Sequence, residues 1–147
     1  MDVRYTERMA AAVQAAGELA VAQRSPELFT IHLLTVLSAQ NDSTFSRLLV
    51  ANGVDLKAFH TFTDERSRQI APFGSSGTNI RPSQENVALL QGAAAEMREI
   101  GDTRLGTEHL LLAALKYRPG KGAWSVFNLS YAPVRKSLDA VRKNTTV

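Results

Sequence analysis

The sequence contains no cysteine, which excludes disulfide bonds, thiol nucleophiles and thiolate metal sites within this chain. It has no long apolar run, and residues 1–5 lack the apolar core of a signal peptide. Its 17 Lys and Arg residues against 14 Asp and Glu residues leave a net charge of only +3, and the basic residues are dispersed. We therefore expect a soluble, cytoplasmic protein whose partners include neither nucleic acid nor a membrane.

No segment sustains the alternation of apolar and polar residues that is typical of β-strands. With 147 residues and 44% hydrophobic content, the chain is long enough for one domain with a real core and too short for two of typical size. We therefore predict a single all-α domain of about eight helices.

The sequence contains itself twice. When it is shifted by 77 positions, residues 6–34 align with residues 83–111 without a gap, and eight of the 29 positions are identical. Unrelated segments of this length match at about two positions, given ordinary residue usage. This period is too long for a solenoid unit of about 20–50 residues, so we interpret it as one duplicated helical half-domain packed against its copy.

The duplication predicts repeat one at residues 1–70, a linker at 71–81 and repeat two at 82–147. Residues 71–78 are rich in turn-forming types and show no periodicity, which is typical of a linker. Because the halves are copies, we expect a near-twofold rotation to relate them. Functional surfaces would then lie at equivalent positions or along the seam between the halves.

Cap residues and apolar spacing predict the individual helices. Thr6 and Ser83 would begin two matching amphipathic helices. The apolar stripe of the first consists of Met9, Val13, Ala16 and Ala20, and that of the second of Val87, Leu90, Ala94 and Met97. Ser25-Pro26-Glu27 combines a cap, a proline and a first-turn acid, so it predicts the start of a helix that reaches Ala39. The other predicted helices cover 44–52, 55–69, a segment beginning near Thr107, 123–129 and 133–143.

Three short motifs carry a family resemblance. Arg4-Tyr5-Thr6 and Arg81-Pro82-Ser83 open the first helix of each half, and the second half contains Gly106-Thr107-Glu108-His109-Leu110-Leu111-Leu112. Over nearly its whole length the chain resembles the Clp N-terminal domain, the doubled four-helix unit at the head of Clp-class AAA+ unfoldases and disaggregases. The resemblance implies a double Clp repeat that binds substrates or adaptors and passes them to an ATP-driven ring, with no catalysis of its own.

The resemblance also implies the partners. They are unfolded or tagged protein substrates and adaptor proteins, with no cofactor, a hexameric parent ATPase and a monomeric isolated domain. The chain has no phosphate loop, because Gly120-Lys121 lacks the required spacing of glycines. Two arrangements stay open: the N-terminal domain of a longer ATPase, or a free-standing accessory protein of the Clp system. A reading frame that continues into phosphate-loop sequence would favour the first.

Glu108 is the main candidate binding residue. A carboxylate in the first turn of a helix is stabilised by the helix dipole, and it can hold a guanidinium group through two hydrogen bonds. In relatives that partner a protease, the matching Glu is present in both halves and, with nearby hydroxyls, holds phosphorylated arginine. Here Ile31 replaces the first copy. The resemblance therefore implies at most one phosphoarginine site, around Glu108 and Ser83, with Thr6 as the matching hydroxyl of the first half.

His32 and His109 recur at equivalent positions next to predicted helix starts. We expect them to bond to backbone or to a neighbouring helix end, because a metal site needs further ligands and His60 is not suitably spaced. A third alternative is an unrelated helical enzyme or ligand carrier. That alternative requires the two histidines and nearby acids to converge in a deep polar pocket.

Aromatic residues gather late in each half and in the linker. Most should be core, but a shallow apolar groove at the seam, lined by some of them, would suit a protein that grips unfolded segments. The candidate contacts are Phe73, Trp124 and Tyr131.

Overall fold

A computed structural model describes residues 3–72, 80–117 and 122–143 of the chain. These residues form eight α-helices and no β-strand, which confirms the predicted all-α fold. The helices are α1 (Glu7–Ala22), α2 (Thr30–Ala39), α3 (Thr44–Ala51), α4 (Leu56–Arg68), α5 (Gln84–Ile100), α6 (Thr107–Tyr117), α7 (Ala123–Val126) and α8 (Tyr131–Lys143). None of them is both long and apolar enough to cross a membrane.

The two predicted hydroxyl caps are confirmed. The side-chain oxygen of Thr6 accepts a hydrogen bond from the backbone N–H of Met9 at 3.2 Å, and that of Ser83 accepts one from Asn86 at 3.1 Å. Each bond satisfies one of the N–H groups that the first turn of a helix leaves without a partner. Both caps therefore fix the start of a long helix at the predicted residue.

The two halves exchange the segments that precede their first helices. The N–H of Thr6 donates to the carbonyl oxygen of Leu105, and the N–H of Ser83 donates to that of Leu28, both at 3.0 Å. The return bonds run from Leu105 to the carbonyl of Arg4 at 2.7 Å and from Leu28 to that of Arg81 at 2.9 Å. A shift of 77 residues converts each bond into its counterpart, as a near-twofold relationship between the halves requires.

This pairing corrects the predicted start of the second helix. Ser25-Pro26-Glu27 does not begin α2, which starts at Thr30 after the N-cap Phe29. Both backbone polar groups of Leu28 are bonded to the other half, so the chain stays extended there. The Ser25 hydroxyl donates to the carbonyl oxygen of Glu27 and closes a local turn instead.

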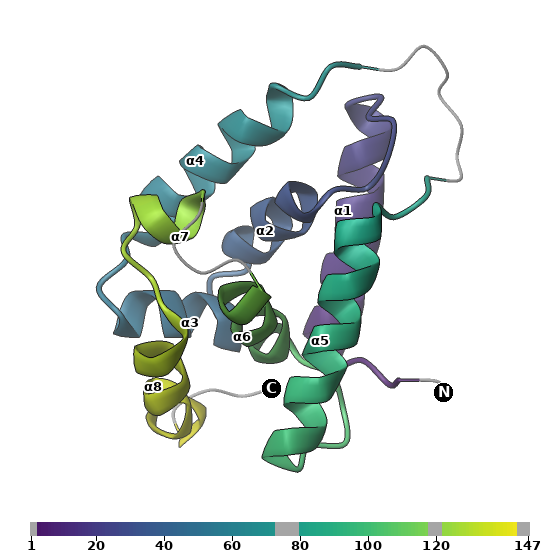
Figure 1. Cartoon of the computed structure of the whole chain (residues 1–147). Helices are drawn as coiled ribbons and strands as arrows, with labels where there is room; N and C mark the ends of the chain where they lie inside the picture. The colour runs from purple at the N-terminus through teal and green to yellow at the C-terminus, as the bar shows by residue number, and fades with distance from the viewer. Residues whose placement is uncertain (1–2, 73–79, 118–121, 144–147) are drawn as a thin grey trace.

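The core lies around α6, the most deeply buried helix. Every residue from Thr107 to Leu115 is buried, and α6 packs against α3, α5 and α8. Its counterpart α2 packs against α1, α3 and α4. Figure 1 shows α2 and α6 at the centre, with α1 and α5 on one side and α3, α4, α7 and α8 on the other. The central helices therefore carry the core of both halves.

The buried faces of α1 and α5 differ from those predicted. In α1 the buried residues are Met9, Ala12, Ala16 and Ala20, and in α5 they are Asn86, Leu89, Ala93, Ala94, Glu96 and Met97. Val13 and Leu90 are only half-buried, and Val87 is 43% exposed. Val13 and Leu90 therefore pack against the edge of the core, and Val87 of the predicted stripe lies outside it.

The last two helices also differ in length from their predictions. The segment predicted as a helix over 123–129 ends at Val126, because Asn128 adopts a positive φ of 54° that a right-handed helix does not allow. α8 begins at Tyr131, two residues before the predicted start at Pro133. Of the predicted linker, residues 73–79 lie outside the described residues, while Arg81 already pairs with Leu28.

Candidate functional site

A pocket of about 330 Å³, lined by polar and charged residues, lies at the N-terminal end of α6. Its lining combines one residue from the start of the chain, the loop between α5 and α6, the first turn of α6 and the end of α8: Thr6, Asp102, Thr103, Arg104, Glu108, His109 and Arg142. The exchanged pairing of Thr6 with Leu105 is what brings the first half into this pocket.

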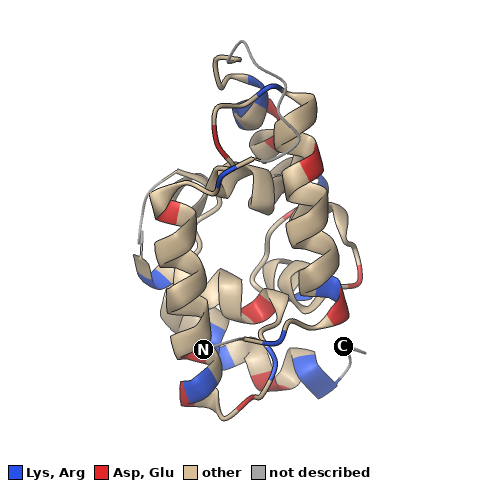
Figure 2. Cartoon of the chain, turned by 90° about the vertical axis from the view of Figure 1, so that its right-hand side faces the viewer, with Lys and Arg blue, Asp and Glu red and all other residues tan. Residues whose placement is uncertain are grey.

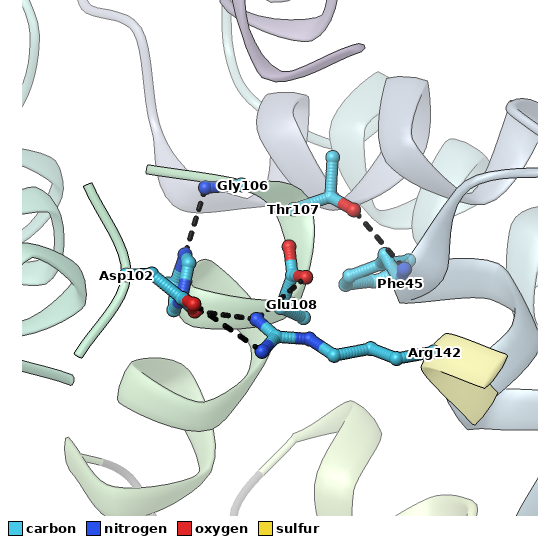
Figure 3. Close-up of polar contacts among 7 residues, drawn as sticks. Phe45, Asp102, Gly106, Thr107, Glu108 and Arg142 are labelled. Carbon is cyan, nitrogen blue, oxygen red and sulfur yellow. Dashed lines mark hydrogen bonds and ion pairs between the residues drawn. The ribbon is translucent and has the colours of Figure 1, made fainter. Parts of the chain in front are cut away.

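Glu108 is buried in this pocket and already holds a guanidinium group. The residue is 3% exposed, and its Oε2 accepts a hydrogen bond from Nη2 of Arg142 at 3.0 Å. The same Nη2 lies 2.5 Å from Oδ2 of Asp102 (Figure 3). Burial alone would lower the pKa of Arg142, but hydrogen bonds and charges from Asp102 and Glu108 outweigh it and raise that pKa. One guanidinium group thus bridges two carboxylates.

His109 joins the pocket to the helix cap. Its Nδ1 accepts a hydrogen bond from the backbone N–H of Gly106 at 2.8 Å, so the ring proton lies on Nε2, which donates to Oδ2 of Asp102 at 2.7 Å. Burial alone would raise the pKa of Asp102, but the hydrogen bonds from Arg142 and His109 lower it below its usual value. Asp102 is therefore an anion that accepts bonds from two elements.

Gly106 leaves room for the side chain of Glu108 in its observed position. A Cβ atom at residue 106 would lie 2.0 Å from Oε1 of Glu108, far inside van der Waals contact. The neighbouring Thr107 accepts a hydrogen bond through its hydroxyl from the backbone N–H of Phe45 at 3.0 Å and so ties α6 to the first turn of α3. Each residue of the Gly-Thr-Glu-His motif thus makes a contact or leaves space at the N-terminal end of α6.

The structure places Thr6, and not Ser83, beside Glu108. Ser83 caps α5 and bonds to Leu28, and it is not among the residues that line the pocket. The predicted grouping of Glu108 with Ser83 was wrong, because it assumed that each hydroxyl serves its own half. The exchanged pairing instead carries Thr6 of the first half to the second.

The histidine of the first half has the same structural role. Nδ1 of His32 accepts a hydrogen bond from the backbone N–H of Phe29 at 2.9 Å, and its Nε2 lies 3.2 Å from Oε1 of Gln23. Burial lowers the pKa of His32, which is completely enclosed. The described residues contain no group of three or more side chains that is suited to hold a metal ion.

The predicted aromatic contacts are mainly internal. Trp124 is 5% exposed and stacks on Phe59, with 5.9 Å between ring centroids. Tyr131 donates its hydroxyl hydrogen to the buried carboxylate of Glu96, whose other oxygen accepts from Nζ of Lys116 at 3.3 Å. Phe73 lies outside the described residues.

Two further hollows lie on the outer faces of α1 and α5. The α1 groove has a volume of about 630 Å³ and is lined by Val13, Gln14, Gly17, Glu18, Val21, Ala22, Leu28 and Ile80. The α5 groove has a volume of about 390 Å³ and is lined by Val3, Tyr5, Val87, Leu90, Gln91, Ala94, Arg98 and Leu105. Both linings are mainly apolar, which is typical of surfaces that bind peptide segments.

The two grooves are products of the duplication. A shift of 77 residues maps Val13 onto Leu90, Gln14 onto Gln91, Gly17 onto Ala94, Val21 onto Arg98, Leu28 onto Leu105, and Val3 onto Ile80. One wall of each groove comes from the segment that precedes the other long helix: Ile80 lines the α1 groove, and Val3 and Tyr5 line the α5 groove. Both grooves therefore depend on the exchanged pairing. In the view of Figure 2, acidic and basic segments are interspersed, and the bodies of the long helices are mostly uncharged.

Sequence reasoning missed these grooves because it placed their residues on the same apolar stripe as residues that are buried. Val13, Val87 and Leu90 follow helical spacing, as core residues do. One signal in the sequence could have revealed the α1 groove, because α1 has more apolar residues than one buried stripe needs. It carries alanines at 12, 16 and 20 in addition to valines at 13 and 21. The small alanines are buried, and the larger valines at 13 and 21 stay half-buried and line the groove.

Comparison with known proteins identifies the family of this chain. The family model described as the Clp repeat (R) N-terminal domain matches residues 4–124. Chaperone protein ClpB 1 of Parasynechococcus marenigrum (strain WH8102) is 32% identical over 145 residues, which cover 98% of this chain and 17% of that protein. The chain thus spans about one sixth of the length of that relative.

Solved structures share the fold. The Hsp104 N-terminal domain from Candida albicans has a TM-score of 0.81 at 19% identity and covers 95% of this chain and 91% of its own. A ClpV N-domain in complex with a VipB peptide has a TM-score of 0.79 at 20% identity, with 97% of this chain and 89% of its own covered. From the family match and the doubled architecture together, this chain belongs to the Clp repeat N-terminal domain family.

Proposed function

We propose that this chain is a non-catalytic binding domain that captures exposed apolar segments of unfolded proteins or adaptors for a Clp-type ATPase. The observation that carries the proposal is the pair of apolar grooves outside α1 and α5. The ClpV N-domain that shares the fold is a complex with a peptide, which supports peptide binding by this fold. The proposal includes a cytoplasmic location and a hexameric parent ATPase, with a monomeric isolated domain.

The histidine geometry supports a binding role over an enzymatic one. Nδ1 of His32 and Nδ1 of His109 each accept a backbone hydrogen bond at the start of their own helix. Neither nitrogen is therefore free to accept a proton from a substrate without loss of the helix cap. The alternative of a free-standing accessory protein uses the same grooves, and the length of the natural reading frame distinguishes it.

The test is the binding of a permanently unfolded, reduced and alkylated model protein to the isolated chain, with its native disulfide-bonded form as a negative control. We expect weak, reversible binding of the unfolded form and neither binding nor hydrolysis of ATP. Val13→Gln and Leu90→Gln should each weaken binding, because each introduces an amide into a groove. Val50→Gln is the matched control, since Val50 is 57% exposed and lies outside both grooves. Tight ATP binding, or equal binding by all three variants, would contradict the proposal.

A second candidate function is recognition of phosphoarginine at Glu108. It is favoured by one observation, that the Glu108 carboxylate already binds a guanidinium group, that of Arg142. A ligand guanidinium would have to displace Arg142, so Arg142→Gln should strengthen the binding of a phosphoarginine peptide and Glu108→Gln should weaken it. Binding that responds to neither substitution would contradict this function.

A further inference from the structure

The two grooves have the same origin but opposite charges. Glu18 is the one acidic or basic side chain among the residues that line the α1 groove, and Arg98 is the one among those that line the α5 groove, where it occupies the position that corresponds to Val21. Both residues are exposed, and neither side chain forms an ion pair with another described residue. The charges are therefore available to a bound partner.

The two grooves differ in the row of helix residues that forms the floor of each. Along α1, residues 13, 17 and 21 are half-buried and spaced by four, so they form one row that an occupant would contact. The matching row of α5 has Ala94 where α1 has Gly17, and Arg98 where α1 has Val21. The α5 row therefore carries one more methyl group and one long charged side chain, and the α5 groove has the smaller volume, about 390 Å³ against about 630 Å³.

Gly17 has no structural explanation within the described chain. It lies in the middle of the 16-residue helix α1, where glycine is less favourable than alanine. Its φ is not in the left-handed region, and an added Cβ would meet Leu28 Cδ1 at 3.9 Å, an ordinary contact. Neither packing nor backbone conformation requires a glycine here. What its missing methyl provides is room for the backbone of an occupant to approach α1.

We infer that the α1 groove, and not the α5 groove, binds an apolar peptide segment that carries a lysine or arginine beside Glu18. The aliphatic stem of such a residue can lie on Val21, which follows Glu18 by three residues on the same helix face, while its charge meets the carboxylate. In the α5 groove, Arg98 would repel the same side chain. This inference rests on the proposed function and names the chemistry of the segment that is captured.

The test uses two fluorescently labelled apolar peptides of twelve residues that differ only at a central lysine or glutamate. At low ionic strength, the wild-type chain should bind the lysine peptide about threefold more tightly, as expected for one solvent-exposed ion pair. Glu18→Gln should remove this preference, and Glu18→Lys should reverse it. Arg98→Gln is the matched control and should leave the preference unchanged. A preference that depends on Arg98 and not on Glu18 would overturn the inference.

Gly17→Ala separates binding from stability. It should raise the melting temperature, which shows that the variant folds, and should weaken binding of the lysine peptide about fivefold because the methyl group fills the floor. Ala94→Gly, the equivalent change in the α5 groove, should lower the melting temperature without changing that affinity. Unchanged affinity of Gly17→Ala for the lysine peptide would overturn the inference. The inference would also be overturned if the wild-type chain self-associates and Gly17→Ala abolishes that self-association, because the groove would then bind a second copy of the chain.

Binding of the unfolded model protein, measured in parallel, separates the two levels of the proposal. If that protein binds through Leu90 and the lysine peptide shows no preference, the inference is wrong and the proposed function stands. If the unfolded protein and both peptides fail to bind, the proposed function itself is wrong.

Discussion

Nη2 of Arg142, in the last turn of α8, lies 3.0 Å from Oε2 of Glu108, in the first turn of α6. The side chain of Glu108 is 4% exposed and that of Arg142 is 26% exposed, so the pair is largely shielded from water. Such a pair adds little to the free energy of unfolding by itself. Removal of its cation is strongly destabilising, because it leaves a buried carboxylate without a partner.

Arg142→Met should therefore destabilise the domain by about 2 kcal/mol, since it keeps an apolar stem but leaves Glu108 and Asp102 without their cation. Urea denaturation measures this loss as a lower midpoint at an unchanged slope. The matched control is Arg68→Met, which removes an ion pair with Asp64 whose arginine side chain is 69% exposed. That change should cost less than about 0.5 kcal/mol. Equal losses in the two variants would show that the pocket is as solvated as the surface.

The stability of the domain should fall as the pH is lowered below 6.5, the ordinary pKa of histidine, because burial lowers the pKa of His32 in the folded state. In that range the unfolded chain binds a proton at this residue that the folded chain does not. Stability therefore rises with pH there, with a slope of up to about 1.4 kcal/mol per pH unit.

His32→Gln tests this assignment. A glutamine three residues after the N-cap can accept the hydrogen bond from Phe29, as in a capping box, but it does not titrate. Urea midpoints at pH 5, 6 and 7 should therefore vary less in the variant than in the wild type. An identical pH dependence in both proteins would mean that other groups cause the acid sensitivity.

Tyr131→Phe should cost about 1–2 kcal/mol, because it leaves one oxygen of Glu96 without the phenolic donor in a residue that is only 3% exposed. Tyr117→Phe is the control, since Tyr117 is 58% exposed. Burial and the bond to Glu96 raise the pKa of Tyr131 to about 12. Its contribution is therefore complete below pH 10 and is lost as the pH rises toward 12. Absorbance titration of phenolate should show a step near pH 12 that Tyr131→Phe removes.

Local sequence signals predicted much of the fold correctly. Thr6 and Ser83 act as caps, and Asp55 caps α4, because a side-chain oxygen next to free backbone N–H groups needs no distant partner. The shift of 77 residues likewise predicted equivalent helices, since copies of one sequence favour one local structure. The start of α2 was not predictable in this way, because Leu28 is held extended by bonds to Arg81 and Ser83 of the other half.

The candidate site, too, was predictable from the sequence only in part. Its residue types were visible in the sequence: Glu108 at a helix start, and histidines at matching positions. That Glu108 meets Thr6 and Arg142 was not visible, because these residues are 102 and 34 positions away from it and only the exchanged pairing and the packing of α8 bring them together.

By itself, the sequence determined the helical class, the duplication and the caps, all of which depend on neighbours along the chain. The tertiary structure decided which apolar face of α1 and α5 is buried, because both faces satisfy helical spacing. Alanines at 12 and 16 are completely buried in α1, whereas Val13 stays half-buried at the edge of the core and lines a groove. Only the packing of the two halves shows that part of the apolar surface is left uncovered.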